Sequence, residues 1–360
     1  MNVRAVLFLL LVFAAPAFAQ GFAGLGTDAE GYRTVEPGRT FSFPADHGPH
    51  EGFRIEWWYV TANLEDADGN DYGLQWTLFR QALAPGEEGE GWESSALWMG
   101  HAGLTTGERH FSAEKFARGG IGQAGVVAAP FEAFIDDWAL AGDVAAEQAP
   151  NGDTMANVSV NATGDDFIYA MTLQTERAPV LQGEAGYSVK SDAGQASYYY
   201  SQPFYRAEGT ITVDGEEIPV TGTAWLDREW SSQPLADDQE GWDWFSLHLP
   251  GDDKLMLFQV RSEDGSSYYS GTWFTPDGVA TPLANDAITM TPLGTTDIDG
   301  RIVPTQWRLE IPSRDFEITT EALNPQSWMA TTFAYWEGPI RFSGTHEGKG
   351  YLEMTGYDSD

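Results

Sequence analysis

The sequence predicts an all-β protein, because turn signals recur along the chain and helical periodicity is nearly absent. Apolar and aromatic runs of five to nine residues alternate with turns, and 40 glycines and 19 prolines interrupt them. One short helix is expected at 113–118. Many short strands at regular spacing predict a β-barrel or a β-sandwich. The clearest turn signals are Asp-Gly pairs: Asp68-Gly69, Asp214-Gly215, Asp264-Gly265, Asp277-Gly278 and Asp299-Gly300.

An internal repeat indicates two related β-domains. An aromatic strand at 56–59, a tight turn and a strand ending in Arg80 are echoed by 242–245, a turn and a strand ending in Arg261. Tyr200, Pro203 and Arg206 are echoed by Trp336, Pro339 and Arg341 with one residue of slippage, and 225–227 by 351–353. The repeat predicts that Trp58 is equivalent to Trp244, and Asp227 to Glu353.

The repeat also predicts the domain boundaries. We expect a first β-barrel at 37–233 and a second at 234–360, joined by an acidic loop that contains Pro234. The first copy is longer, and the excess is expected between His110 and Lys190, a segment rich in glycine and alanine.

The first residues have the pattern of a secretory signal peptide. Arg4 precedes an apolar core at 6–15, and Ala17-Phe18-Ala19 is a small-x-small cleavage site before Gln20. We therefore expect a signal peptide at 1–19, a linker at 20–36, and a secreted or periplasmic protein. No later stretch is long and apolar enough to predict a membrane span in the mature chain.

Composition excludes several classes of protein and of site. The 360 residues include no cysteine, which excludes disulfide scaffolds, cysteine nucleophiles and thiolate metal sites. The formal net charge of −35 disfavours nucleic acid and anionic membrane surfaces as partners. Abundant acidic residues with only four lysines are also typical of proteins that tolerate high salt, and an ordinary acidic secreted protein is the alternative.

Common catalytic and cofactor motifs are missing or out of context. No G-x-S-x-G or H-E-x-x-H occurs. The G-x-G-x-x-G at 120–125 follows no convincing strand and is interpreted as a glycine loop, and 66–70 as a β-turn rather than a calcium loop. His47 and His50 lack an identifiable third metal ligand. We therefore predict no metal and no cofactor.

Acidic residues set among aromatic residues are the strongest candidates for a site. Side chains two apart on a strand share a face, so Trp225, Asp227 and Glu229 face one way. Glu56 and Trp58 share a face in the same manner. Such carboxylates are either paired with arginine or have raised pKa values. The second case yields a neutral general acid facing an apolar cavity.

Six ordered segments resemble one known family: FPADHGPHEGFRIEWWYVTANL, GLQWTLFRQAL, GYSVKSDAGQASYYYSQP, GTAWLDREWSSQPL, GWDWFSLHL and YWEGPIRFSGTHEGKGYLEMTGY. They resemble the secreted branch of the carotenoid 1,2-hydratase (hydroxyneurosporene synthase) family, also described as AttH-type, lipocalin-like or predicted secreted hydrolase. The resemblance covers about residues 37–360. It implies two lipocalin-like (calycin) β-barrels, an apolar lipid- or polyene-like ligand, and hydration of a carbon–carbon double bond.

The resemblance also implies structural roles and one departure. In calycins a tryptophan of the opening strand stacks under an arginine of the last strand, a role that Trp57 or Trp58 with Arg206 fits, as does Trp242 or Trp244 with Arg341. The family commonly has histidine at the position of Arg228. Its absence weakens the inference of hydratase activity.

Together these patterns define candidate site residues and competing functions. Asp227 or Glu229 is the candidate general acid, and His101 or Glu56 would orient water. An aromatic-lined cavity would equally suit a non-enzymatic lipid carrier of the periplasm, and two barrels filled with side chains would suit a protein-binding scaffold. A hydrolase, as the family description suggests, is a further alternative without a visible nucleophile. The candidate ligand-binding residues are Trp57, Trp58, Tyr59, Lys190, Tyr200, Trp225, Trp230, Trp242, Asp243 and Trp244.

Overall fold

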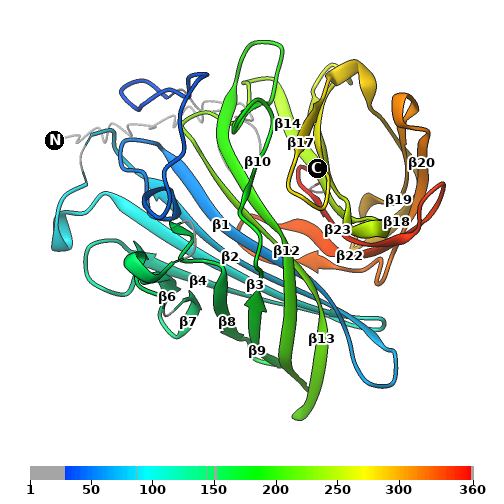
Figure 1. Ribbon diagram of the computed structural model, residues 1–360, viewed down its shortest axis with the longest axis horizontal. Helices are drawn as coiled ribbons and strands as arrows, with labels where there is room; N and C mark the ends of the chain where they lie inside the picture. Colours follow the sequence, from blue (N-terminus) through cyan, green and yellow to red (C-terminus); the bar gives the residue numbers. More distant parts are fainter. Residues whose placement is uncertain (1–28, 87, 143, 150–151, 358–360) are drawn as a thin grey trace, which may run out of the picture.

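The structure, a computed structural model, describes residues 29–86, 88–142, 144–149 and 152–357. The predicted signal peptide and the first part of the predicted linker lie outside the described residues. Regular structure in the described part is almost entirely β-strand, in two strongly curved sheets (Figure 1), so the all-β, two-barrel prediction is confirmed. No helix there is long and apolar enough to cross a membrane. The short 3-10 helices are η2 (Ala45–His47), η3 (Gly91–Glu93), η4 (Ala146–Gln148), η6 (Pro250–Asp252), η7 (Asn285–Ala287) and η8 (Pro312–Arg314).

The first sheet has 13 strands in the order β4-β3-β2-β1-β13-β12-β9-β8-β7-β6-β5, with β10 and β11 paired to β12. Every pairing is antiparallel. The strands are β1 (Ile55–Glu65), β2 (Asp71–Ala82), β3 (Ala96–Thr106), β4 (His110–Arg118), β5 (Ala124–Ala128), β6 (Phe131–Ile135), β7 (Trp138–Ala141), β8 (Asn157–Thr163), β9 (Phe167–Gln174), β10 (Val180–Leu181), β11 (Tyr187–Val189), β12 (Ala196–Val213) and β13 (Glu216–Ser231).

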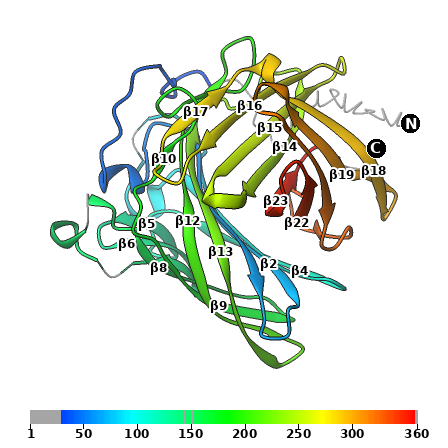
Figure 2. The same cartoon turned by 45° about the vertical axis from the view of Figure 1, so that its right-hand side comes forward.

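The second sheet has ten strands in the order β17-β16-β15-β14-β23-β22-β20-β19-β18, with β21 paired to β22. Figures 1 and 2 show it as a second barrel packed beside the first. The chain passes between the sheets in the segment from Ser231 to Gln239. Its strands are β14 (Gln239–His248), β15 (Lys254–Ser262), β16 (Ser267–Phe274), β17 (Ala280–Leu283), β18 (Thr289–Ile298), β19 (Arg301–Ile311), β20 (Phe316–Ala322), β21 (Trp328–Met329), β22 (Tyr335–Gly344) and β23 (Gly348–Met354).

The two sheets share one topology, because the opening strand of each pairs with the strand that closes it. β1 lies between β2 and β13 in the first sheet, as β14 lies between β15 and β23 in the second. The first sheet has three more strands than the second, and β5 to β11 all fall in the segment between His110 and Lys190 that the repeat marked as longer.

The strand register corrects one predicted equivalence. Asp227 pairs across from Tyr59, and Glu353 pairs across from Trp244. If Asp227 and Glu353 are equivalent, then Trp244 corresponds to Tyr59 and not to Trp58. A slip of one residue moves a side chain to the other face of a strand, so Trp58 points into the first barrel while Trp244 points out of the second.

Turn chemistry follows the sequence closely. The glycine of every Asp-Gly pair has a positive φ, between 81° and 87°, and each pair joins two neighbouring strands. Glycine is the residue that adopts this conformation without a steric penalty. The helix expected at 113–118 is instead part of β4, where His101 to Leu97 of β3 pair with Glu114 to Arg118, so pairing with a neighbouring strand overrides the local pattern.

Hydrophobic side chains fill both barrels, and a third cluster joins them. Trp58, Trp76 and Leu226 belong to the cluster inside the first barrel, and Phe245 and Trp307 to that inside the second. The third cluster lies between the sheets and includes Tyr59, Tyr199, Trp225, Trp244 and Phe258. Successive side chains of β1 and β14 therefore point alternately into a barrel interior and into the layer between the barrels.

The arginine that stacks on the opening tryptophan is not the expected one. The guanidinium carbon of Arg228 lies 3.8 Å from the centre of a Trp58 ring, whereas Arg206 is exposed. Arg341 is also exposed and pairs with Asp71 of the first sheet. Arg228 is on β13, directly opposite Trp58 across the β1–β13 ladder, and that register decides the contact.

Candidate functional site

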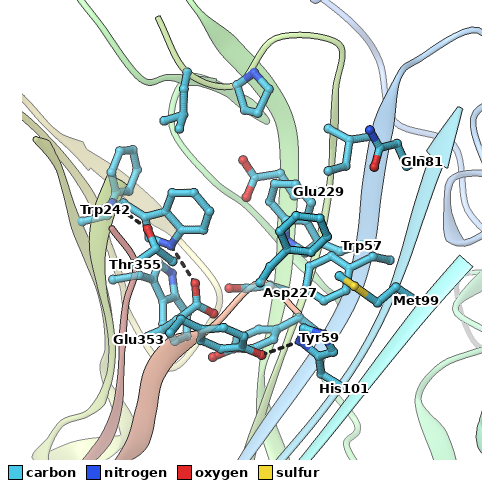
Figure 3. Close-up of a pocket in the computed structure, with 18 of the residues that line it drawn as sticks. Trp57, Tyr59, Gln81, Met99, His101, Asp227, Glu229, Trp242, Glu353 and Thr355 are labelled. Carbon is cyan, nitrogen blue, oxygen red and sulfur yellow. Dashed lines mark hydrogen bonds between the residues drawn. The ribbon is translucent and has the colours of Figure 1, made fainter. Parts of the chain in front are cut away.

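A cavity of about 140 Å³ lies in the layer between the two sheets. An apolar cavity of about this size accommodates a benzene molecule. Its walls come from the outward faces of β1, β2, β3 and β13 on one side and β14, β15, β22 and β23 on the other (Figure 3). Aromatic side chains dominate the wall and include Trp57, Tyr59, Tyr199, Trp242, Trp244 and Phe258.

Asp227 is the most deeply buried carboxyl group on this wall, with 2% of its surface exposed. Its Oδ1 accepts hydrogen bonds from Ser201 Oγ at 2.5 Å and Trp225 Nε1 at 2.7 Å, and its Oδ2 accepts one from the Tyr199 hydroxyl at 2.5 Å. These donors favour the carboxylate, but burial has the larger effect and raises the pKa of Asp227 to about 7. Asp227 is therefore a carboxyl group that carries a proton in part at neutral pH.

Glu353 is the second carboxyl group of the cavity, on the wall formed by the second barrel (Figure 3). Its Oε1 accepts a hydrogen bond of 2.6 Å from Trp242 Nε1. Burial raises the pKa of Glu353 to about 7, and the negative charge of Asp227 adds to the effect. The charge state of Asp227 therefore affects the pKa of Glu353.

Tyr59 links Glu353, which is half-buried, to the fully buried Glu337. Its hydroxyl bonds to Glu337 and also to Glu353. A phenol has a single proton to donate, so one of these bonds requires a protonated carboxyl group as the donor. Burial and the charge of Glu353 hold the pKa of Glu337 well above its usual range, which agrees with a neutral acid.

Glu229 also lines the cavity but has a cationic partner. Lys190 Nζ lies 2.9 Å from Glu229 Oε1, and Ser197 donates a hydrogen bond to the same oxygen. Lys190 also lies 4.2 Å from the centre of the Phe258 ring. The predicted common face of Trp225, Asp227 and Glu229 is observed, with Trp225 behind Asp227 as a hydrogen-bond donor.

His101 reaches the cavity with both ring nitrogens occupied. Nδ1 lies 3.0 Å from the Tyr335 hydroxyl, and Nε2 lies 3.0 Å from Glu114 Oε1. Burial lowers the pKa of His101, so the ring favours its neutral form. Tyr335 in turn bonds to Glu337, so a continuous series of hydrogen bonds runs from Glu114 to the cavity acids.

Glu56 does not line the cavity. It lies on the opposite face of β1, inside the first barrel, and is fully buried. Arg80 Nη1 lies 2.8 Å and Arg228 Nη2 2.5 Å from its carboxylate, and His50 donates from its backbone. These positive charges hold the pKa of Glu56 well below its usual range despite burial. The expectation that Glu56 would join Asp227 is therefore wrong in its geometry.

Other predicted site residues also face a barrel interior. Trp58, Tyr200 and Trp230 lie inside the first barrel, where Trp230 stacks on the His50 ring at 3.8 Å between centroids. Asp243 faces the interior of the second barrel and pairs with Arg261 at 2.7 Å. Strand alternation places each of them on the face opposite the cavity. The predicted residues that do meet there are Trp57, Tyr59, His101, Lys190, Asp227, Glu229, Trp242 and Trp244.

Sequence reasoning missed Glu353, Tyr199 and Glu337 as site residues. The repeat already aligned Glu353 with Asp227, so the signal for the second acid was present in the sequence. Tyr199 lies in a run of three tyrosines, and only the register of β12 against β13 shows which of them faces Glu229 and the cavity. Glu337 approaches Tyr59 from the other barrel and has no local signal.

No group of three histidine, cysteine, aspartate or glutamate side chains in the described ranges is arranged to hold a metal ion. The side chains around the cavity offer carboxyl groups, phenols, indoles and one lysine–glutamate pair. Acids of pKa near neutrality among aromatic rings are suited to donating protons to an apolar ligand.

Comparison with solved structures finds similar folds over most of the chain. An AttH-assigned protein from Nitrosomonas europaea has 33% sequence identity and a TM-score of 0.78, over 91% of this chain and 100% of that one. Kievitone hydratase from Nectria haematococca has the same fold at 16% identity, with a TM-score of 0.67 over 92% and 97% of the two chains. CghA, solved with Sch210972, reaches a TM-score of 0.53 at 12% identity over 85% and 89%.

A search of curated protein sequences found no match. The family model described as AttH-like matches residues 34–357, which include both sheets and every residue of the cavity. The chain belongs to the AttH-like family.

Proposed function

We propose that the cavity between the barrels binds an apolar small molecule with a carbon–carbon double bond, and that Asp227 catalyses hydration of that bond as a general acid. The observation that carries this proposal is the neutral-range carboxyl group of Asp227 on an aromatic wall without a cationic partner among its hydrogen-bond donors. Protonation of an alkene carbon needs such an acid, because the proton must leave a neutral donor in a dry site.

The proposed reaction balances with the residues of the cavity. The proton of Asp227 adds to one alkene carbon, and the π electrons form the new C–H bond, leaving a cation at the other carbon. The oxygen of a water molecule adds to that cation and loses a proton to the ionised Glu353. One proton then returns from Glu353 to Asp227 through solvent, so the net change is addition of water.

The aromatic wall supports the cationic intermediate. Ring faces such as those of Trp57, Trp242 and Trp244 attract a cation by about 0.5–2 kcal/mol each. Glu229 is a weaker candidate for the acid than Asp227, because its carboxylate is already paired with Lys190. His101 has no free ring nitrogen, and we assign it to positioning Tyr335 and the hydrogen bonds that lead to Glu337.

Likeness of fold supports the proposal only by analogy. One structural neighbour is named a hydratase and another was solved with Sch210972. The strongest competing function is a carrier that binds the same kind of ligand without changing it, since the apolar wall would serve both. Hydrophobic side chains pack the interiors of both barrels, and in either case we propose the cavity between the sheets as the ligand site.

The deciding experiment uses a prenylated phenol and its saturated counterpart as probes, with product formation followed by mass spectrometry in water labelled with heavy oxygen. Wild-type protein should add one labelled water to the alkene and leave the saturated probe unchanged. Asp227→Asn keeps the shape of the side chain without a transferable proton, and should reduce turnover about 10²–10⁴-fold with little change in binding. Asp214→Asn, on the exposed turn between β12 and β13, is the matched control.

If both probes bind and no product forms, the result would favour the carrier function and contradict hydration. Full activity of a stably folded Asp227→Asn variant would remove Asp227 as the acid. Native mass spectrometry of protein purified from its own host would then identify the molecule that the cavity retains.

We also propose that the protein acts outside the cytoplasm after removal of residues 1–19, and that it divides into domains at 37–233 and 234–360. The pattern around Ala17-Phe18-Ala19 supports the first point, and the change of sheet after β13 supports the second. Sequencing of the mature N-terminus should begin near Gln20, and proteolysis or separate expression of the halves tests the division.

A further inference from the structure

Buried acids in this protein differ in what neutralises them. In the barrel interiors, Glu56 has Arg80 and Arg228, and Asp243 has Arg261. In the cavity, Glu229 has Lys190. A buried carboxylate without a neighbouring positive charge is energetically costly, and each of these three carboxylates has a cationic partner.

Asp227 and Glu353 are different, because the groups bonded to them are neutral. Asp227 has a serine, a tyrosine and a tryptophan as donors, and Glu353 has Trp242 and Tyr59. Both acids open onto one cavity, and both lie beside indole rings. Protein sites that bind organic cations commonly combine aromatic ring faces with carboxyl groups.

We propose that the cavity binds an apolar organic cation, such as a quaternary ammonium group on an aromatic body, with Asp227 and Glu353 as its counter-ions. The inference rests on the proposed function in placing the ligand in this cavity. The inference goes beyond the proposed function because it gives the ligand a permanent positive charge. Hydration of an alkene requires only a transient positive charge, on the intermediate. The ligand then provides the positive charge that is missing among the groups bonded to these two acids.

Binding of a cation should release protons, because the two acids are partly protonated at neutral pH. The groups that face Asp227 are Tyr199, Glu229 and Lys190; Glu229 and Lys190 already neutralise each other. Burial keeps the pKa of the Tyr199 hydroxyl well above its usual range, so it stays protonated.

The surroundings of Glu353 lead to the same expectation. Tyr59 and Glu337 face it, and the pKa values of both are held well above their usual ranges. A cation in the cavity therefore takes its compensating negative charge from Asp227 and Glu353. Affinity for a cation should rise with pH until the pH passes about 7, the pKa of both acids, and then level off.

Isothermal titration calorimetry with two isosteric probes tests this. Benzyltrimethylammonium and neopentylbenzene have the same shape and differ in charge. The cation should bind with one-to-one stoichiometry and at least about 10-fold more tightly than the neutral probe at pH 8. Titrations near pH 6 in two buffers of different ionisation enthalpy should show proton release for the cation and none for the neutral probe.

Variants separate the cavity from the acidic surface. Asp227→Asn and Glu353→Gln should each reduce proton release and flatten the dependence of affinity on pH, whereas Asp214→Asn should change neither. Binding should persist in about 0.5 M salt, because exposed charges are screened there and a buried pair much less. Using two acid variants keeps the test valid if one of them does not fold.

Equal affinity for the two probes would overturn the proposal and leave hydration of a neutral alkene untouched. Cation binding with proton release, without hydration of any alkene probe, would support it and remove the catalytic proposal. Loss of binding at high salt, or no binding of either probe, would also overturn it.

Discussion

Asp227 and Glu353 occupy corresponding places in the two barrels and meet at one cavity. Each lies on the strand that closes its sheet, opposite an aromatic residue of the opening strand: Tyr59 for Asp227 and Trp244 for Glu353. The Trp244 indole bonds to the Tyr199 hydroxyl, which in turn donates to Asp227, so the second barrel reaches the acid of the first. Two similar strand pairs therefore each contribute one acid to a single cavity.

The stability of the protein should depend on the ionisation of Asp227. Its pKa is raised from 3.8 to about 7, so the folded state binds the proton more tightly than the unfolded state. The free energy of unfolding therefore falls as pH rises from about 4 to about 7, by up to about 4 kcal/mol for this group. Urea unfolding at pH 5 and pH 8 should show that the free energy of unfolding falls less between these pH values for Asp227→Asn than for wild type. An equal loss in both would contradict the assignment.

Glu56 should show the opposite pH dependence. Its pKa is lowered from 4.5 by Arg228 and Arg80, so its stabilisation is present above that value and is lost as pH falls below it. Glu56→Gln leaves the buried Arg228 guanidinium without its carboxylate and leaves Arg80 with Glu88 alone, and it should cost about 3–5 kcal/mol at pH 7. Binding of cavity ligands by the folded variant should be unchanged, since Glu56 faces the other way. Reduced affinity in a fully folded variant would place Glu56 back in the site.

Arg228→His should lower the stability of the protein and leave ligand binding in the cavity unchanged. Histidine is common at this position in the family that the sequence resembles. Arg228 is fully buried, stacks on Trp58 and bonds to Glu56 and the Gly48 carbonyl, all inside the first barrel. An imidazole cannot make all of these contacts, so Arg228→His should unfold at lower urea concentration. Calorimetry with the cavity probes should give wild-type affinities, and a shifted affinity would show that the two faces of β13 are coupled.

Tyr199→Phe should raise the pKa of Asp227 further. The hydroxyl donates to the Asp227 carboxylate at 2.5 Å and lowers its pKa, so its removal leaves burial less opposed. The pH at which cation binding ceases to release protons should move upward. Tyr205→Phe is the matched control, because its hydroxyl bonds to the Met155 carbonyl inside the first barrel. An unchanged midpoint in Tyr199→Phe would show that this hydrogen bond does not tune the acid.

Salt should stabilise the protein. A net charge of −35 makes the folded chain repel itself, and added ions screen that repulsion. The melting temperature should rise between low and molar concentrations of NaCl, and KCl should act alike if screening is the cause. A melting temperature that does not rise would remove the interpretation of the composition as an adaptation to salt.

The sequence by itself determined the fold class, the repeat and the face shared by Asp227 and Glu229. Alternation along a strand, turn chemistry at Asp-Gly pairs and the recurrence of one strand pair are local properties, and local properties can be predicted from neighbouring residues. Asp227 was a candidate acid on the same grounds, because its aromatic neighbours on the strand are visible in the sequence.

Only the tertiary structure decided which acids share a cavity and which are neutralised. Glu56 and Asp227 have equally aromatic neighbours in the sequence, yet the β1–β13 register sends Glu56 to two arginines and Asp227 to the layer between the barrels. Glu353 joins Asp227 because the second barrel packs on the outer face of the first. The pKa of a carboxyl group depends on charges and burial contributed by residues far away in the chain, and those are set by strand register and packing rather than by sequence neighbours.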